Sequence, residues 1–421
     1  MTTPGRAHIR WFRNTAPYIN AHRGKTFVLM LGGLATQHDN FANIIHDIAL
    51  LNSLGVKLVL IHGSRPQIEE RLARAGHSSA VHEGVRITDD DALEHVKDAA
   101  GSLRAQIEAL LSMGLPNSPM AGSQFRVCSG NFVTARPIGV VDGVDFQHTG
   151  KVRRVDAEGI DKQLSEGSIV LQSPLGYSPT GEIFNLSLED IAVHTAAAIG
   201  ADKLILFGEA AGIYNADGEL IRQCAVGEIT TLDIPDAGQA ELLQTARSAC
   251  MSGVARCQVI SYRDDCALLE ELFTHDGSGT LVASDEYEQS REASIDDIGG
   301  ILELIEPLEQ EGILLKRSRE LLEQEISRFR LLERDGRIIA CAALYPYAAA
   351  DCGEIACIVS HPDYRGGRRG QRLLEILEQE ARRQGLSRVF VLTTQTAHWL
   401  SLIHISEPTR PPVASRMPSS A

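Results

Sequence analysis

Two features in the last third of the chain have residue types and spacing that suit a chemical reaction. Residues 365–370 read RGGRRG, a run of three guanidinium groups and three glycines. Glycines leave backbone amides open to close approach and guanidinium groups bind phosphate oxygens in pairs, so the run is suited to hold a diphosphate. Upstream of it, Glu354 offers a carboxylate that can accept a proton. The residues of the run are Arg365, Gly366, Gly367, Arg368, Arg369 and Gly370.

A strand and a helix must position these groups. Residues 355–359 are apolar and rich in β-branched side chains, which is typical of a buried strand. Apolar side chains at helical spacing begin at Leu373, and the positive end of that helix would favour an anion at the run. Strand alternation would place Ala356 and Ile358 on the same face as Glu354. From the residues alone, Glu354 also fits a solvated carboxylate at a strand end.

Composition narrows the class of protein. A chain of 421 residues with 43% hydrophobic and 23% charged residues predicts two or three globular domains. A net charge of −15 argues against nucleic-acid or anionic-membrane partners. The N-terminus lacks a signal-peptide core, so we expect a cytoplasmic protein. The eight cysteines form no C-x-x-C pair, so we expect buried thiols and no metal site.

The order of patterns predicts the architecture. Strands are expected over residues 26–31, 56–61, 169–172, 203–207, 257–261 and 277–283, with helices over 41–54, 67–75, 89–113, 186–199, 240–251 and 265–273. This alternation predicts a parallel sheet covered by helices on both faces. Residues 125–155 instead show short alternating strands and turn dipeptides, which predict hairpins.

A second, smaller domain is expected after a polar linker at residues 284–292. Helices over residues 296–308 and 318–326 precede a hairpin formed by residues 329–332 and 338–344. The strand and helix around the glycine–arginine run follow, and residues 388–393 predict one more strand.

The apolar strand, the residues HPDYRGG and the leucine-rich helix resemble the acyl-CoA-binding core of the GNAT acetyltransferases. Their pattern has Arg or Gln, two free positions, Gly, one free position, then Gly or Ala. Arg365 and Gly370 fit, whereas Arg368 stands where the first glycine is required. The resemblance implies that residues 365–370 hold CoA.

The first 283 residues resemble the amino acid kinase family, most closely the N-acetylglutamate kinases. The segments that carry the resemblance are PYINAHRGKTFVLMLGG, LVLIHGSRPQI, HEGVRITDD, SGNFV, FNLS, ADKLILFGE and LLEELFTHDGSGTLV. Such kinases have a lysine where this chain has Met30, and a glycine turn where it has Ser64 and Arg65. A thioether cannot neutralise phosphoryl charge, so we expect phosphoryl transfer to be lost.

A kinase fold without kinase chemistry, joined to an acetyltransferase, resembles the bacterial N-acetylglutamate synthase family over residues 1 to about 400. This implies an α/β/α regulatory domain over residues 1–283, the linker at 284–292 and a GNAT α+β domain over 293–399. It also implies that the enzyme transfers acetyl from acetyl-CoA to the α-amino group of L-glutamate, the first step of arginine biosynthesis. Acetyl-CoA would be a co-substrate and not a tightly bound cofactor. L-Arginine would inhibit by feedback, and the chain would form a homo-oligomer, for which the resemblance suggests a ring of six subunits.

The same resemblance assigns residues to these ligands. Tyr18, Glu271 and Gly277 match positions of the arginine effector site; without it, Glu271 reads as a solvated helix residue. We expect Glu354 to act as the base, through water. Cys357, Ile358 and Val359 are assigned to the CoA arm, and we expect Cys357 to be a packing thiol and not a nucleophile. Lys316 and Arg317 are assigned to a carboxylate of glutamate. Thr393 and Thr394 are expected to orient the substrate.

The tail departs from the family. From Leu400 the chain reads LSLIHISEPTRPPVASRMPSSA, whose composition suits neither strand nor helix. We interpret residues 400–421 as foreign to the family and expect the acetyltransferase domain to lack its C-terminal strands. The alternative function is therefore a catalytically impaired, arginine-binding assembly protein. An active kinase is disfavoured by Met30, Ser64 and Arg65.

Overall fold

The computed structural model describes residues 13, 15–113, 121–122, 125–274, 277–283, 289–334, 337–362 and 369–392. The chain divides into two compact units, Met1–Tyr287 and Glu288–Ala421, and each is described by itself. Across those ranges, no helix combines the length and apolar character needed to cross a lipid bilayer.

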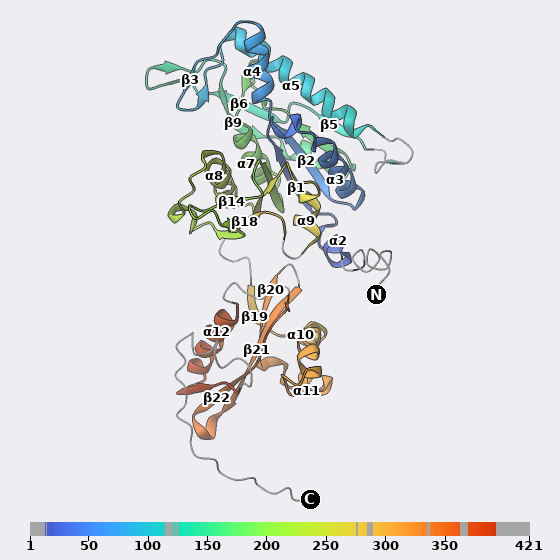
Figure 1. Cartoon of the computed structure of the whole chain (residues 1–421), viewed down its shortest axis with the longest axis vertical. Helices are drawn as coiled ribbons and strands as arrows, with labels where there is room; N and C mark the ends of the chain where they lie inside the picture. The colour runs from blue at the N-terminus through green and yellow to red at the C-terminus, as the bar shows by residue number, and fades with distance from the viewer. Residues whose placement is uncertain are drawn as a thin grey trace, which may run out of the picture. The chain divides into compact units, whose positions relative to one another are not determined.

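An eight-stranded sheet forms the centre of the first unit (Figure 1). Its strand order is β16 (Gln223–Ala225), β18 (Thr280–Ala283), β17 (Arg256–Ser261), β13 (Lys203–Gly208), β1 (Thr26–Leu31), β2 (Lys57–His62), β10 (Ile169–Gln172) and β5 (Val127–Ser129). Side chains of the central strand β1 alternate between two hydrophobic clusters, with Val28 and Met30 in one and Phe27 and Leu29 in the other. The sheet is therefore buried on both faces, as the sequence predicted.

Helices cover both faces of this sheet. α6 (Ala157–Ser165), α7 (Leu188–Ala198) and α8 (Ala237–Met251) contribute to the cluster of Val28 and Met30. α3 (Phe41–Ser53), α5 (Asp90–Leu111) and α9 (Ala267–Phe273) contribute to the opposite cluster, with α2 (Ala16–His22) packed against it. α4 (Arg65–Arg74) packs against α5.

Two expectations about this unit need correction. β18 runs antiparallel to β17, although every other neighbouring pair in the sheet is parallel. Residues 125–155 form hairpin strands such as β6 (Val133–Pro137) and β9 (Gly150–Val155), in a four-stranded sheet with β11 (Leu175–Tyr177) and β12 (Ile183–Asn185). The first strand of that stretch, β5, instead extends the main sheet by pairing with β10.

The second unit is a five-stranded sheet in the order β19 (Gln289–Glu292), β20 (Phe329–Arg334), β21 (Arg337–Tyr347), β22 (Cys352–Ser360) and β23 (Arg388–Phe390). β22 and β23 are parallel, and the other pairs are antiparallel. α12 (Arg369–Arg383) packs on one face, and α10 (Ile298–Gln310) and α11 (Arg319–Glu325) pack on the other (Figure 1).

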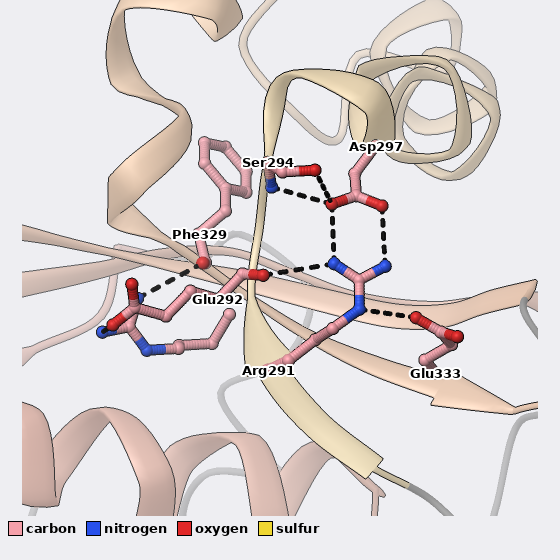
Figure 2. A network of polar contacts seen from close by, with 7 residues as sticks. Arg291, Glu292, Ser294, Asp297, Phe329 and Glu333 are labelled. Atoms are coloured by element: carbon pink, nitrogen blue, oxygen red, sulfur yellow. Dashed lines mark hydrogen bonds and ion pairs between the residues drawn. The ribbon is translucent and has the colours of Figure 1, made fainter.

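Residues 289–292, which the sequence analysis placed in the linker, form the edge strand β19. Arg291 of this strand donates from Nη1 and Nη2 to the two oxygens of Asp297, both at 2.7 Å, and from Nε to Glu333 at 2.5 Å (Figure 2). Asp297 also accepts from the backbone N–H and the hydroxyl of Ser294. The network joins β19 to the start of α10 and to β20. The polar composition of this segment predicted a linker, but its polar side chains form hydrogen bonds to other residues of the second unit.

Candidate active site

Glu354 lies on β22, between Tyr345 of β21 and Phe390 of β23. Its side chain is half-buried, and Oε2 accepts a 3.1 Å hydrogen bond from the hydroxyl of Tyr347. The Tyr347 ring stacks on Phe390 at 6.2 Å between centroids. This hydrogen bond with Glu354 is the main cause that raises the pKa of Tyr347. Glu354 is therefore a held carboxylate, and not the freely solvated one of the alternative interpretation.

A β-bulge follows Glu354 and changes the expected faces. The pairing of β22 with β21 shifts between Cys341 and Ala343, and Cys357 adopts a left-handed backbone with φ of 53°. An extra residue at a bulge breaks the alternation of side chains. Ile358 accordingly packs against the cluster under α12, whereas the Glu354 partner Tyr345 packs against the cluster under α10 and α11. The prediction that Ile358 shares a face with Glu354 is wrong for this reason.

Cys357 is a buried thiol at the bulge. It is 4% exposed and packs in the cluster under α10 and α11. Burial raises the pKa of Cys357 to about 11, partly opposed by Arg317 and reinforced by Glu309, Glu325 and Glu354. The thiolate required of a nucleophile is scarce at neutral pH.

The two expected carboxylate-binding residues differ in their surroundings. Lys316 is exposed. Arg317 is half-buried, donates from its backbone N–H to Glu309 Oε1 at 2.9 Å, and lies with Cζ 6.0 Å from the centre of the Tyr345 ring. Burial disfavours its charge, but neighbouring groups, Cys357 first among them, outweigh burial and raise the pKa of Arg317. Arg317 thus remains cationic on the Glu354 side of the sheet.

The expected CoA-binding run falls mostly outside the described residues. Arg365, Gly366, Gly367 and Arg368 lie there, as do Thr393 and Thr394 and the whole tail from Leu400. Arg369 and Gly370 form the start of α12, although the sequence placed them in the turn and predicted that the helix begins at Leu373. Within the described residues, β23 pairs only with residues 352–354 of β22, so no described strand pairs with Ile358 and Val359 on that edge.

Two of the three expected effector residues, Glu271 and Gly277, lie together in the first unit. α2 lies beside α9 (Figure 1), where His22 Nε2 is 2.8 Å from the carbonyl oxygen of Leu272. Tyr18 packs against the cluster that contains α9. Glu271 Oε2 accepts the backbone N–H groups of Ser278 at 2.9 Å and Gly279 at 3.1 Å, so Glu271 is not a solvated helix residue. Gly277 has φ of 64°, and a Cβ there would lie 2.6 Å from the same oxygen.

The residues that depart from the kinase pattern line one cavity. A hollow of about 940 Å³ lies at the carboxyl ends of β1 and β2 and includes Met30, Ser64 and Arg65 in its wall. Met30 and Ser64 are each 2% exposed. The Met30 thioether therefore forms part of the cavity wall and brings no positive charge to it. Among the described residues, no cluster of three or more His, Cys, Asp or Glu side chains is arranged to hold a metal ion.

Comparison with known proteins agrees with the two-unit order. The amino acid kinase family model matches residues 25–261, and the acetyltransferase (GNAT) family model matches residues 299–399. An amino-acid acetyltransferase of Ectopseudomonas mendocina is 57% identical over 394 residues, which cover 93% of this chain and 91% of the relative. One from Azotobacter vinelandii is 58% identical over 396 residues, 94% and 92% of the two chains.

The chain belongs to the amino-acid acetyltransferase family.

Solved structures support this membership and the fold. The N-acetylglutamate synthase of Neisseria gonorrhoeae, complexed with coenzyme A and L-arginine, is 37% identical with a TM-score of 0.86, covering 97% of this chain and 95% of that one. The same synthase complexed with coenzyme A and N-acetyl-glutamate is 39% identical with a TM-score of 0.64, covering 94% and 91%. The resemblance to the bacterial N-acetylglutamate synthases, and the order of a kinase-type unit before a GNAT unit, are confirmed.

Sequence reasoning missed several side chains of this acetyltransferase. Tyr345 and Tyr347 lie two residues apart on β21 and reach Glu325 and Glu354, respectively. Their period-2 spacing with Cys341 and Ala343 was a usable signal, because alternation places all four on the face under α10 and α11. Glu325 ends α11 and carried no such signal.

Proposed function

We propose that this acetyltransferase transfers acetyl from acetyl-CoA to the α-amino group of L-glutamate, and that its first unit binds L-arginine as a feedback inhibitor. The observation that carries the proposal is a half-buried glutamate and a half-buried arginine on one face of the acetyltransferase sheet, at a bulge beside a stretch of β22 that no described strand pairs with on the β23 side. The coenzyme A, N-acetyl-glutamate and L-arginine in the Neisseria complexes support the choice of ligands.

Glu354 is proposed as the general base. An α-amino group has a pKa near 8 and is mostly an ammonium ion at neutral pH. It loses two protons on becoming an amide N–H: one passes through water to Glu354, and one ends on the departing CoA sulfur. The C–N bond forms as the C–S bond breaks. Arg317 pairs with a carboxylate of glutamate, for which its planar fork is suited.

The CoA arm is proposed to run along the free edge of β22, with Cys357, Ile358 and Val359 beside it and the diphosphate at residues 365–370. Thr393 and Thr394 follow β23 in sequence and are proposed to orient the substrate. Helix α12 begins at Arg369, within the run, and the positive end of a helix favours an anion such as a diphosphate.

Arginine is proposed to bind at Tyr18, Glu271 and Gly277. Glu271 already holds two backbone amides through Oε2, which fixes its carboxylate. A fixed carboxylate, together with a backbone carbonyl, suits a guanidinium. The resemblance also supports a cytoplasmic enzyme that catalyses the first step of arginine biosynthesis. It supports a homo-oligomer of up to six subunits as well, and light scattering after size-exclusion chromatography would test this assembly.

The deciding assay measures thiol release from acetyl-CoA with and without L-glutamate and L-arginine. Glutamate-dependent release that arginine suppresses is the expected result. Release that does not depend on glutamate would refute the substrate, and arginine-insensitive release would refute the effector. ATP consumption on N-acetylglutamate would contradict the loss of kinase chemistry inferred from Met30.

The second candidate is a catalytically impaired arginine-binding protein. The match to the acetyltransferase family model stops at residue 399, where the family-unlike tail begins. Arginine binding measured by calorimetry, without any thiol release, would favour this candidate.

A further inference from the structure

Tyr345 occupies the centre of a polar cluster that the reaction scheme above does not use. It lies on β21, and its half-buried side chain packs on the face under α10 and α11. Its hydroxyl donates to Glu325 Oε2 at 2.8 Å. The ring, in turn, lies between two guanidinium groups: Cζ of Arg328 is 4.9 Å from the ring centre, and Cζ of Arg317 is 6.0 Å from it.

Both oxygens of Glu325 are engaged. Oε2 accepts from Tyr345, and Oε1 accepts from Arg328 Nη1 at 3.2 Å. Arg328 therefore contacts both the carboxylate and the ring, and Tyr345, Glu325 and Arg328 form a closed frame. A carboxylate can accept about four hydrogen bonds, so Glu325 keeps some acceptor capacity, but the positive charge of Arg328 offsets its charge and the Tyr345 hydroxyl takes an acceptor site on Oε2, and both reduce its attraction for a further cation.

Arg317 is the cation that this frame leaves available. It lies between α10 and α11, in a segment that belongs to neither helix, and its Nη1 donates to the carbonyl of Leu315 at 3.2 Å. Glu325 lies close enough to favour the charged form of Arg317. Within the described part of the second unit, however, Arg317 has no carboxylate as an ion-pair partner. A long side chain in such a segment loses binding energy to rotamer entropy unless neighbours hold it.

We propose that Tyr345 and Glu325 are positioning residues of this acetyltransferase: the Tyr345 ring fixes the Arg317 guanidinium, and the Tyr345 hydroxyl occupies Glu325 so that Arg317 stays free for the substrate carboxylate. The inference rests on the proposed binding of glutamate by Arg317. This positioning role differs from a role of Tyr345 in proton transfer. Burial, with the hydrogen bond to Glu325, raises the pKa of Tyr345 to about 12, so the hydroxyl keeps its proton and donates it in the hydrogen bond to Glu325.

The test titrates L-glutamate into the full chain saturated with CoA, which cannot react, and follows the heat of binding. Tyr345→Phe keeps the ring but frees Glu325 Oε2 to capture Arg317, so glutamate affinity should fall about tenfold, the worth of roughly one charge-assisted hydrogen bond. CoA affinity should change less than twofold. The double variant Tyr345→Phe with Glu325→Gln removes the competing charge, and glutamate affinity should return to within threefold of wild type.

Glu323→Gln is the matched control, because it removes an exposed carboxylate of the same helix that pairs with Arg319. It should leave glutamate affinity unchanged. Equal glutamate affinity in wild type and Tyr345→Phe overturns the positioning role alone, as does a loss that the double variant does not recover. A parallel loss of CoA affinity assigns Tyr345 to general stability and also overturns it. Failure of the wild-type chain to bind glutamate overturns the proposed substrate as well.

Discussion

Replacing Asp297 by Asn should loosen the second unit without affecting the first. The carboxylate accepts two bonds from Arg291 and two from Ser294, and it is 9% exposed (Figure 2). Asn keeps the shape but loses the charge and half of the paired acceptors. Breaking a fully buried ion pair costs about 3–5 kcal/mol. The Arg291 side chain is 39% exposed, and solvent weakens an exposed ion pair, so we expect the loss of this pair to cost less, about 2 kcal/mol of unfolding free energy.

Hydrogen exchange read by mass spectrometry gives the measurement, since a two-unit chain need not unfold in one step. A loss of about 2 kcal/mol corresponds to roughly 30-fold faster exchange in the protected amides of β20 and β21. Peptides from β1 and β2 should exchange as in the wild type. Asp296→Asn, next to it and exposed, is the matched control and should change neither set.

The pH dependence gives a second check. The hydrogen bonds from Arg291, more than those from Ser294, hold the pKa of Asp297 well below its ordinary value. A depressed folded-state pKa means that the stabilisation is fully present above the unfolded value of about 3.9 and is lost as the pH falls below it. Wild type and Asp297→Asn should therefore differ at pH 7 and converge in acid. Unchanged exchange in β20 and β21 at pH 7 would refute the reasoning.

Three further predictions concern the sites. Glu354→Gln should lower kcat by roughly 100-fold or more, as expected for loss of a general base, with the KM for acetyl-CoA within about twofold; an unchanged kcat removes Glu354 as the base. Glu271→Gln keeps an acceptor for the two backbone amides but removes the negative charge, so the arginine affinity measured by calorimetry should fall about tenfold. An equal loss of affinity in the exposed control Glu270→Gln would contradict the assignment. Cys357→Ala should keep kcat within about threefold and leave the pH–rate profile unchanged between pH 7 and 9, because the thiol is protonated there; a thousandfold loss would instead indicate a covalent intermediate.

Local patterns were enough to predict most of the architecture. The strands β1 and β2 are continuous apolar runs, and such runs are stable only when both faces are covered, so alternating helices and a doubly covered sheet follow from the sequence. The start of α12 beside the glycine–arginine run was also predicted, because helical spacing and glycines are read within a few residues. The same local signals placed Glu354 on a strand.

Features that depend on distant partners could not be read this way. The direction of β18 is set by its pairing with β17. β19 is a strand because its backbone pairs with β20, and the bonds from Arg291 to Asp297 and Glu333 add to that pairing. A polar segment predicts a linker unless those partners are known.

The sequence by itself therefore determined the order of the two units, the strand that contains Met30 and the strand that carries Glu354 ahead of the glycine–arginine run in the sequence. The tertiary structure decided which side chains meet. The bulge at Cys357 turns Ile358 away from Glu354, and the frame around Tyr345 leaves Arg317 available. The physical reason is that a bulge and a side-chain cluster both arise from contacts between strands and helices, whose geometry is not contained in the periodicity of any one segment.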